Sequence, residues 1–98
     1  MRFLWDEEKN HRNRAKHKVG FETAALVFDD PHALSIQDRF VEGEERWQTL
    51  GLVEGVVMLL VAHTFCLESG EEIVRIISAR KATPRERGIY DQNQKKAP

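Results

Sequence analysis

Residues 73–86, Ile-Val-Arg-Ile-Ile-Ser-Ala-Arg-Lys-Ala-Thr-Pro-Arg-Glu, predict a strand that leads directly into a helix. The β-branched residues of Ile73–Ala79 favour the strand. Thr83-Pro84-Arg85-Glu86 then places threonine at a helix N-cap, proline at the first helical position and glutamate three residues after the cap, which is a capping box. We therefore predict a helix from this cap to about residue 92.

Strands and turns alternate through the stretch that precedes this one. Turn signals that contain glycine occur at Glu42-Gly43-Glu44, Glu54-Gly55 and Glu68–Gly70. They bound predicted strands at Ala33–Gln37, Arg46–Leu52 and Val56–Phe65. The last of these is apolar without alternation, which predicts a central strand buried on both faces.

A short strand and two helices are predicted at the N-terminal end. Arg2–Trp5 indicates the strand, and Asp6 can cap a helix that runs to about His17. This helix has almost no apolar stripe, and Ala15 is its only clear core residue. A second helix follows the spacing i, i+3, i+4, i+7 and ends at Asp29-Asp30-Pro31; its apolar residues are Phe21, Ala24, Ala25 and Phe28.

A chain of 98 residues is long enough for one domain and too short for two. We predict a single α+β domain over residues 1–92, followed by a disordered tail at 93–98. The longest apolar run, Val56–Ala62, is too short to cross a bilayer, and the N-terminus lacks the apolar core of an export signal, so a cytoplasmic protein without membrane contact is expected. The single cysteine, Cys66, excludes an internal disulfide and a multi-cysteine zinc site.

Charge is distributed unevenly along a chain whose net charge is only −1. Residues 1–20 carry a net charge of +3, residues 21–74 carry −9 and residues 75–98 carry +5. If the two ends meet in the fold, they form one basic surface that can hold a phosphate chain. Pairing of the ends with the acidic middle is an equally good interpretation.

Four stretches of the chain resemble the BrnT family of bacterial toxins. They are Phe3-Leu4-Trp5-Asp6; Lys16-His17 with Phe21-Glu22 and Val27–Pro31; Glu44-Glu45-Arg46 with Thr49-Leu50-Gly51; and Arg75–Thr83 with Arg85-Glu86 and Tyr90. They cover nearly the whole chain in order, and residues 76–83 are the most specific part. The family commonly has glycine directly after the Lys-His pair, where this chain has Lys18.

This resemblance implies a RelE-like fold, with two N-terminal helices on an antiparallel sheet and a C-terminal helix. It implies the toxin component of a type II toxin–antitoxin pair, an RNA endonuclease that inhibits translation. The implied partner is a BrnA-type antitoxin with a ribbon-helix-helix DNA-binding region, which neutralises the toxin. Two toxins and two antitoxins would form a heterotetramer that contacts operator DNA only through the antitoxin.

RNA cleavage without a metal needs a titratable pair of groups and a cation for the phosphate. Arg80 and Arg75 are the predicted phosphate-binding residues, because arginine presents a charged planar fork. Arg80 also precedes a helix N-terminus, a place that favours anions. A structural ion pair with the acidic middle is the alternative for each. The one dense carboxylate cluster suited to magnesium is Asp29-Asp30, which the end of the second helix already explains, so we expect neither a metal nor a cofactor.

Two histidines and a tyrosine complete the predicted catalytic set. His63 lies in the central apolar strand and can share the sheet with Arg75, although a hydrogen-bonded core histidine is the more frequent case. His17 ends the basic first helix, where the helix dipole also stabilises a cation. Tyr90, on the last helix, can stack on a base or pack on the sheet.

Basic residues near both ends are the predicted RNA-binding residues: Lys9, Arg12, Lys16, Lys81 and Arg85. The first three share one face of a helix, and that face could equally contact the antitoxin. A non-catalytic RNA- or protein-binding module on the same scaffold is the alternative function. A DNA-binding regulator acting alone is disfavoured, because the sequence has no helix-turn-helix signature.

Overall fold

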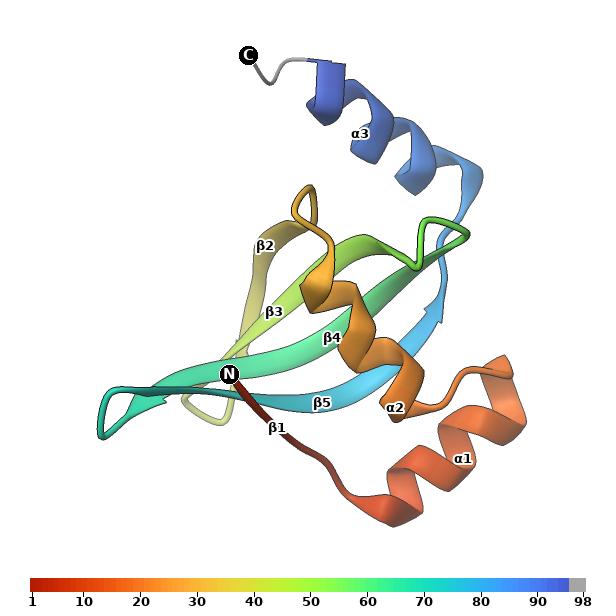
Figure 1. Ribbon diagram of the computed structural model, residues 1–98. Coiled ribbons are helices and arrows are strands. Elements are labelled where there is room, and N and C mark those ends of the chain that lie inside the picture. The colour runs from red at the N-terminus through yellow and green to blue at the C-terminus, as the bar shows by residue number, and fades with distance from the viewer. Residues whose placement is uncertain (96–98) are drawn as a thin grey trace.

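A sheet of five strands forms the centre of the computed structural model, which describes residues 1–95 (Figure 1). In chain order the elements are β1 (Arg2–Leu4), α1 (Glu7–His17), α2 (Phe21–Ala24), the 3-10 helix η1 (Ala25–Asp29), β2 (Leu34–Val41), β3 (Glu44–Val53), β4 (Val57–Glu68), β5 (Glu71–Lys81) and α3 (Pro84–Lys95). The predicted succession of strands and helices is confirmed. Because α3 continues through residues 93–95, the predicted disordered tail is wrong there, and its remainder, residues 96–98, lies outside the described residues.

The strands follow the spatial order β1-β5-β4-β3-β2, so β4 is central as predicted. The predicted burial of this strand on both faces is wrong toward its ends, because Val56 and Phe65 are exposed. β2 to β5 pair antiparallel, whereas β1 runs parallel to β5 and pairs Leu4 with Arg75. The expected antiparallel sheet is therefore wrong at β1, and the sheet is mixed. The apolar pattern of a strand of 3 residues indicates that a strand exists but carries no information about the direction of its pairing.

Each turn between antiparallel strands joins a residue of positive φ to a glycine. The pairs are Glu42-Gly43, Glu54-Gly55 and Ser69-Gly70, with φ between 51° and 80°. Positive φ at both central residues is typical of the type I′ turn, whose twist matches that of paired strands. The three turns predicted from the sequence are thus confirmed.

One face of the sheet carries the main hydrophobic core. α2 and η1 lie over this face (Figure 1), and Phe21, Ala24 and Val27 pack there against Leu59 and Val61 of the central strand. The single helix predicted from residue 21 to 28 consists of α2 and η1 together, and it ends before Pro31 as predicted.

α1 is attached to the sheet by asparagines. Ala15, the predicted core residue, is exposed, and the buried residues of α1 are Asn10 and Asn13. The Asn13 amide donates to the Ala79 carbonyl at 2.9 Å, and its oxygen accepts from the Ala79 N–H at 3.2 Å. β1 pairs with β5 only as far as Arg75, so Asn13 supplies the hydrogen bonds that a neighbouring strand would make at Ala79.

The opposite face of the sheet is covered at one end only. There α3 contributes Tyr90 to a small cluster with Leu50 and Met58. Beyond this cluster, Gln48 and Ala62 are partly exposed and Ser78 is exposed. We call this side, away from α2 and η1, the open face.

Candidate functional site

Two of the predicted site residues, His17 and Arg80, line the same pocket at the open face. Its volume is about 240 Å³, and its lining residues are His17, Gln48, Leu60, Ala62, Ser78, Ala79 and Arg80. His17 is the last residue of α1, and the others belong to β3, β4 and β5. Gln48 pairs with Ala62, and Ala62 pairs with Ser78, so small side chains on two neighbouring strands leave room for the hollow. We call it the Arg80 pocket.

Arg80 is held in place by the helix that follows it. Its Nη1 and Nη2 each donate a hydrogen bond of 2.9 Å to the Glu86 carboxylate. That carboxylate also accepts from the Thr83 N–H, and the Glu86 N–H donates to Thr83 Oγ1, which confirms the predicted capping box. The Nε–H of Arg80 makes no hydrogen bond within residues 1–95, so one edge of the guanidinium is free for a ligand.

The Arg80–Glu86 pair stabilises the charged form of both groups. The hydrogen bonds from Arg80 lower the pKa of Glu86 to about 2. The same hydrogen bonds raise the pKa of the Arg80 guanidinium. Arg80 is thus a fixed positive charge, as phosphate binding requires.

α1 ends beside the pocket in a left-handed residue. Lys18 follows His17, has φ of 62° and donates its N–H to the Arg14 carbonyl at 2.9 Å. A left-handed residue at a helix C-terminus is the position that glycine favours most. Lys18 therefore keeps the left-handed backbone conformation that suits glycine, the residue that is commoner at this position in the family.

His63 lies on the helix-covered face, away from the Arg80 pocket. Its Nε2 is 2.7 Å from Thr49 Oγ1, its Nδ1 is 3.0 Å from the Thr64 carbonyl oxygen, and its ring packs edge-on against Phe28. Burial lowers the pKa of His63. His63 and Arg75 share the sheet as expected, but they point to opposite faces, because Arg75 pairs with Thr64, the next residue.

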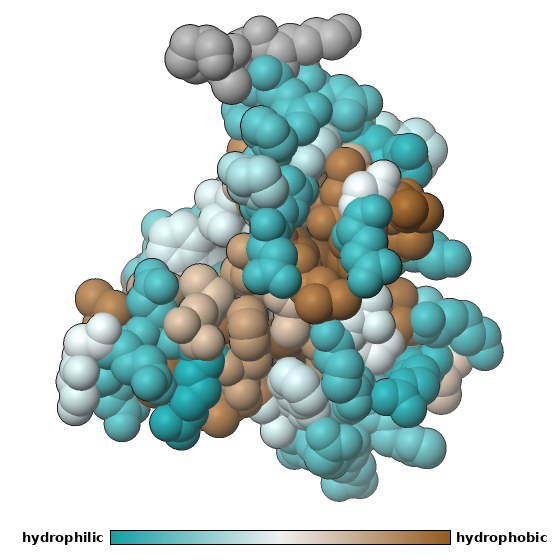
Figure 2. Space-filling view, viewed as in Figure 1, coloured by the Kyte–Doolittle hydropathy of each residue, from teal (hydrophilic) through white to brown (hydrophobic). Residues whose placement is uncertain are grey.

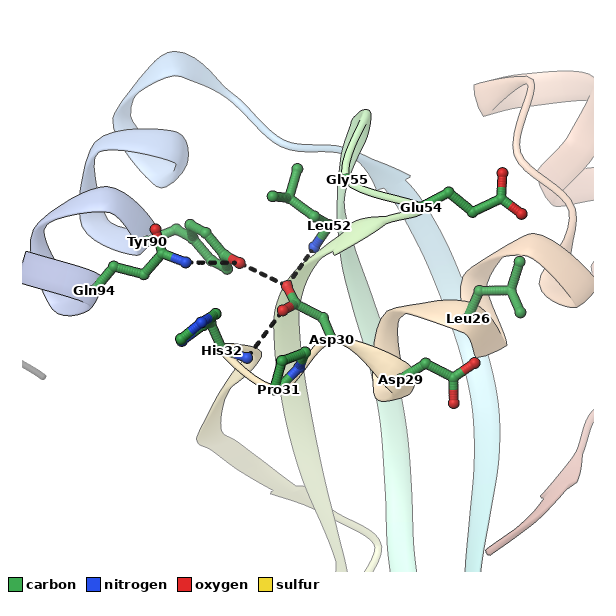
Figure 3. A pocket seen from close by; sticks show the side chains of 10 residues that line it. All are labelled: Leu26, Asp29, Asp30, Pro31, His32, Leu52, Glu54, Gly55, Tyr90 and Gln94. Carbon is green, nitrogen blue, oxygen red and sulfur yellow. Dashed lines mark hydrogen bonds between the residues drawn. The ribbon is translucent and has the colours of Figure 1, made fainter.

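Tyr90 is buried where α3 meets the sheet. Its hydroxyl donates to Asp30 Oδ2 at 2.7 Å, and the same oxygen accepts from the Leu52 N–H (Figure 3). Burial raises the pKa of Tyr90 to about 12. Of the two interpretations of Tyr90, the structure has the packed one.

A cavity of about 420 Å³ lies between this Tyr90 contact and the β3–β4 turn. Hydrophobic residues gather beside that turn (Figure 2), where Val56 and Leu26 are exposed. Asp30 lines the cavity and has hydrogen bonds on both carboxylate oxygens, from Leu52, Tyr90 and His32. Burial opposes ionisation of Asp30, but these hydrogen bonds outweigh it and lower its pKa. The carboxylate is thus already used in packing.

Sequence reasoning missed Gln48 and Ser78, the polar neighbours of Arg80. A β-bulge between Ala62 and His63 makes the partner on β5 jump from Ser78 to Ile76. Simple alternation puts residues 75 and 80 on opposite faces, whereas the bulge brings Arg75, Ser78 and Arg80 to the same face. A local signal for this bulge is absent from the chain.

The predicted RNA-binding residues lie in three places. Lys9, Arg12 and Lys16 are exposed on α1, where Arg12 is 3.8 Å from Glu8. Arg85 is exposed in the first turn of α3. Lys81 pairs with Leu59 on the helix-covered side, so it does not face the Arg80 pocket.

Within residues 1–95, no three His, Cys, Asp or Glu side chains converge as metal ligands would. In the same part of the chain, no helix has the length and apolarity needed to cross a membrane.

A family model described as "Ribonuclease toxin, BrnT, of type II toxin-antitoxin system" matches residues 5–86. The chain belongs to this BrnT family. Among solved structures, the Brucella abortus ribonuclease toxin BrnT is similar, with 25% sequence identity and a TM-score of 0.64 over 85% of this chain and 97% of that one. No curated protein matches. Membership of the BrnT family implies RNA as the target and an antitoxin as the partner.

Proposed function

We propose that this BrnT toxin is an endonuclease that cleaves RNA in the Arg80 pocket without a metal ion, and that His17 and Arg80 carry the reaction. The observation that supports this most directly is that His17 of α1 and the fixed Arg80 of β5 line one pocket on the open face. An imidazole exchanges protons near neutral pH, and a guanidinium binds phosphate oxygens. The pocket therefore offers one titratable group and one phosphate-binding cation, and water can supply the second proton transfer.

In this reaction the 2′-hydroxyl of a nucleotide attacks the adjacent phosphorus while His17 accepts the hydroxyl proton. The bond from phosphorus to the 5′-oxygen breaks, which leaves a 2′,3′-cyclic phosphate and a 5′-hydroxyl. The proton for that hydroxyl comes from the imidazolium or from water. Arg80 donates from its free Nε edge to the phosphate oxygens, whose negative charge increases in the transition state.

Glu86 is a positioning residue in this scheme, because it acts through Arg80. Other predicted site residues have roles outside the reaction itself. We assign packing roles to His63 and Tyr90, and we keep Lys9, Arg12, Lys16 and Arg85 as contacts for RNA or for the antitoxin.

One observation favours a second function, a non-catalytic RNA- or protein-binding module: Glu86 already occupies one edge of the Arg80 fork.

The test is RNA cleavage by the purified protein in EDTA. We expect the wild type to cleave, and His17→Asn and Arg80→Ala to lose at least about 100-fold in rate, the usual size of an acid–base contribution. His11→Asn is the matched control, because His11 is an exposed histidine of the same helix. Circular dichroism checks that each variant is folded.

Three other outcomes of this cleavage test would contradict the proposal. Cleavage retained by both folded variants places the reaction elsewhere. Cleavage that needs added Mg²⁺ contradicts the metal-independent mechanism. A wild type that binds RNA but leaves it intact, with and without ribosomes, establishes the binding module instead.

We further propose that the antitoxin is of the BrnA type and that two toxins and two antitoxins assemble in the cytoplasm. This complex contacts operator DNA through the antitoxin. The toxin inhibits translation when it is separated from the antitoxin. The family supports an antitoxin, and the BrnT resemblance supports its type. Co-expression with the neighbouring reading frame, followed by mass determination by light scattering, checks the stoichiometry. A complex of one plus one chains, or an antitoxin without a ribbon-helix-helix region, contradicts it.

A further inference from the structure

Three arginines lie in one row across the open face, next to the Arg80 pocket. Arg39 of β2 is the register partner of Arg46 of β3, and Arg75 of β5 is the partner of Thr64 of β4. The paired Trp47 and His63 are the chain neighbours of Arg46 and Thr64, so the row continues from β3 to β4. We call Arg39, Arg46 and Arg75 the arginine row.

One carboxylate partly neutralises this row. Glu44 Oε1 is 3.6 Å from the Arg46 Nε and also pairs with Arg75 Nη2. Glu45, the next residue, pairs with Phe40 and points to the other face, because side chains alternate along a strand. Within residues 1–95, Arg39 makes no ion pair, so the row keeps an excess of positive charge.

The row is an unfavourable arrangement for the protein alone. Like charges directly opposite each other on paired strands repel, and Arg39 and Arg46 are such a pair. In addition, the Nε of Arg46 is buried and has no hydrogen-bond partner in the described residues. An unsatisfied buried donor also costs stability. A bound anion would relieve the repulsion between Arg39 and Arg46.

The row adjoins the floor of the Arg80 pocket. Gln48, Ala62 and Ser78 are the next side chains along the open face of β3, β4 and β5. Two residues along a strand correspond to about 6.8 Å. Successive phosphates of an RNA strand follow one another on the same scale, so one strand can reach from the row to the pocket.

We propose that the arginine row is a second phosphate subsite, which binds single-stranded RNA whose adjoining nucleotide occupies the Arg80 pocket. This rests on the proposed function of that pocket. A single strand fits because the row and the pocket make one continuous track on one face of the sheet.

The test is fluorescence anisotropy with a labelled single-stranded RNA whose 2′-oxygens are methylated, so that binding is measured without cleavage. Arg39→Gln and Arg46→Gln should each weaken binding several-fold, and the double variant about tenfold. Each lost phosphate contact should also lower the slope of log affinity against log salt by about 0.7. Arg14→Gln is the matched control, because Arg14 is an exposed, ion-paired arginine on the helix-covered side.

Glu44→Gln provides a test in the opposite direction. It removes the carboxylate that competes with phosphate, so it should tighten binding several-fold, whereas a purely structural Glu44 gives no gain.

Folded row variants that bind RNA like the wild type overturn the subsite, as does a loss of antitoxin binding with unchanged RNA binding. A wild type that binds through the row but never cleaves RNA contradicts the proposed reaction and leaves the subsite supported.

Discussion

Lys18 has the backbone of a glycine without being one. Its φ of 62° is unfavourable for a residue with a Cβ, by about 1 kcal/mol. Lys18→Gly should therefore raise the free energy of unfolding by about 0.5 kcal/mol, after the larger entropy of glycine in the unfolded chain is subtracted. Urea unfolding measures this change. Lys16→Gly, inside α1, should instead destabilise by about 1 kcal/mol, and a Lys18→Gly variant that is less stable than the wild type contradicts the argument.

Single residues were predictable where the signal is local. The capping box at Thr83 and Glu86 follows from three positions of sequence, and the structure has it. That Glu86 also binds Arg80 depends on how the chain turns between β5 and α3, which no local pattern specifies. The same limit applies to His63, whose burial was foreseen but whose hydrogen bond to Thr49 joins two strands.

Among the elements, α1 shows why an apolar stripe is an incomplete guide. Asn10, Asn13 and His17 have the spacing i, i+3, i+7 of a helix face, and this is the face that α1 turns to the protein. The face is polar because it meets backbone groups: Asn10 accepts from the Phe21 N–H and Asn13 pairs with Ala79. A search for apolar residues selects Ala15 instead, which is exposed.

In the strands, the faces depend on two bulges. The irregularity between Gln37 and Arg39 brings Arg39 opposite Arg46, and the one beside His63 brings Ser78 and Arg80 to the open face. A shift of one residue moves every later side chain to the other face. The strands and turns could therefore be predicted, whereas the set of side chains that share the site could not.

In the whole molecule, both interpretations of the uneven charge hold in part. α1, from the basic N-terminal end, packs on β5, which begins the basic C-terminal end, through Asn13 and Ala79. At the same time Arg14 pairs with Glu22 and Arg75 pairs with Glu44, both from the acidic middle. The positive charge that stays free is therefore more localised than the sequence indicates, and Arg39 is part of it.

The whole protein should lose stability as the pH falls. Glu22, Asp30, Glu86 and His63 all have a pKa lowered by folding. Each of these groups therefore binds its proton more tightly in the unfolded chain than in the folded one. Its contribution to the free energy of unfolding is complete above the pKa of the unfolded state and is lost as the pH falls through the pKa of the folded state. For Glu86 this window runs from 4.5 down to about 2. Urea unfolding at pH 7, 5 and 3 measures the free energy of unfolding that is lost as the pH falls. Glu86→Gln should make this loss smaller by about 1 kcal/mol, whereas the control Glu8→Gln, at an exposed glutamate, should not. Equal losses in both variants contradict the assignment.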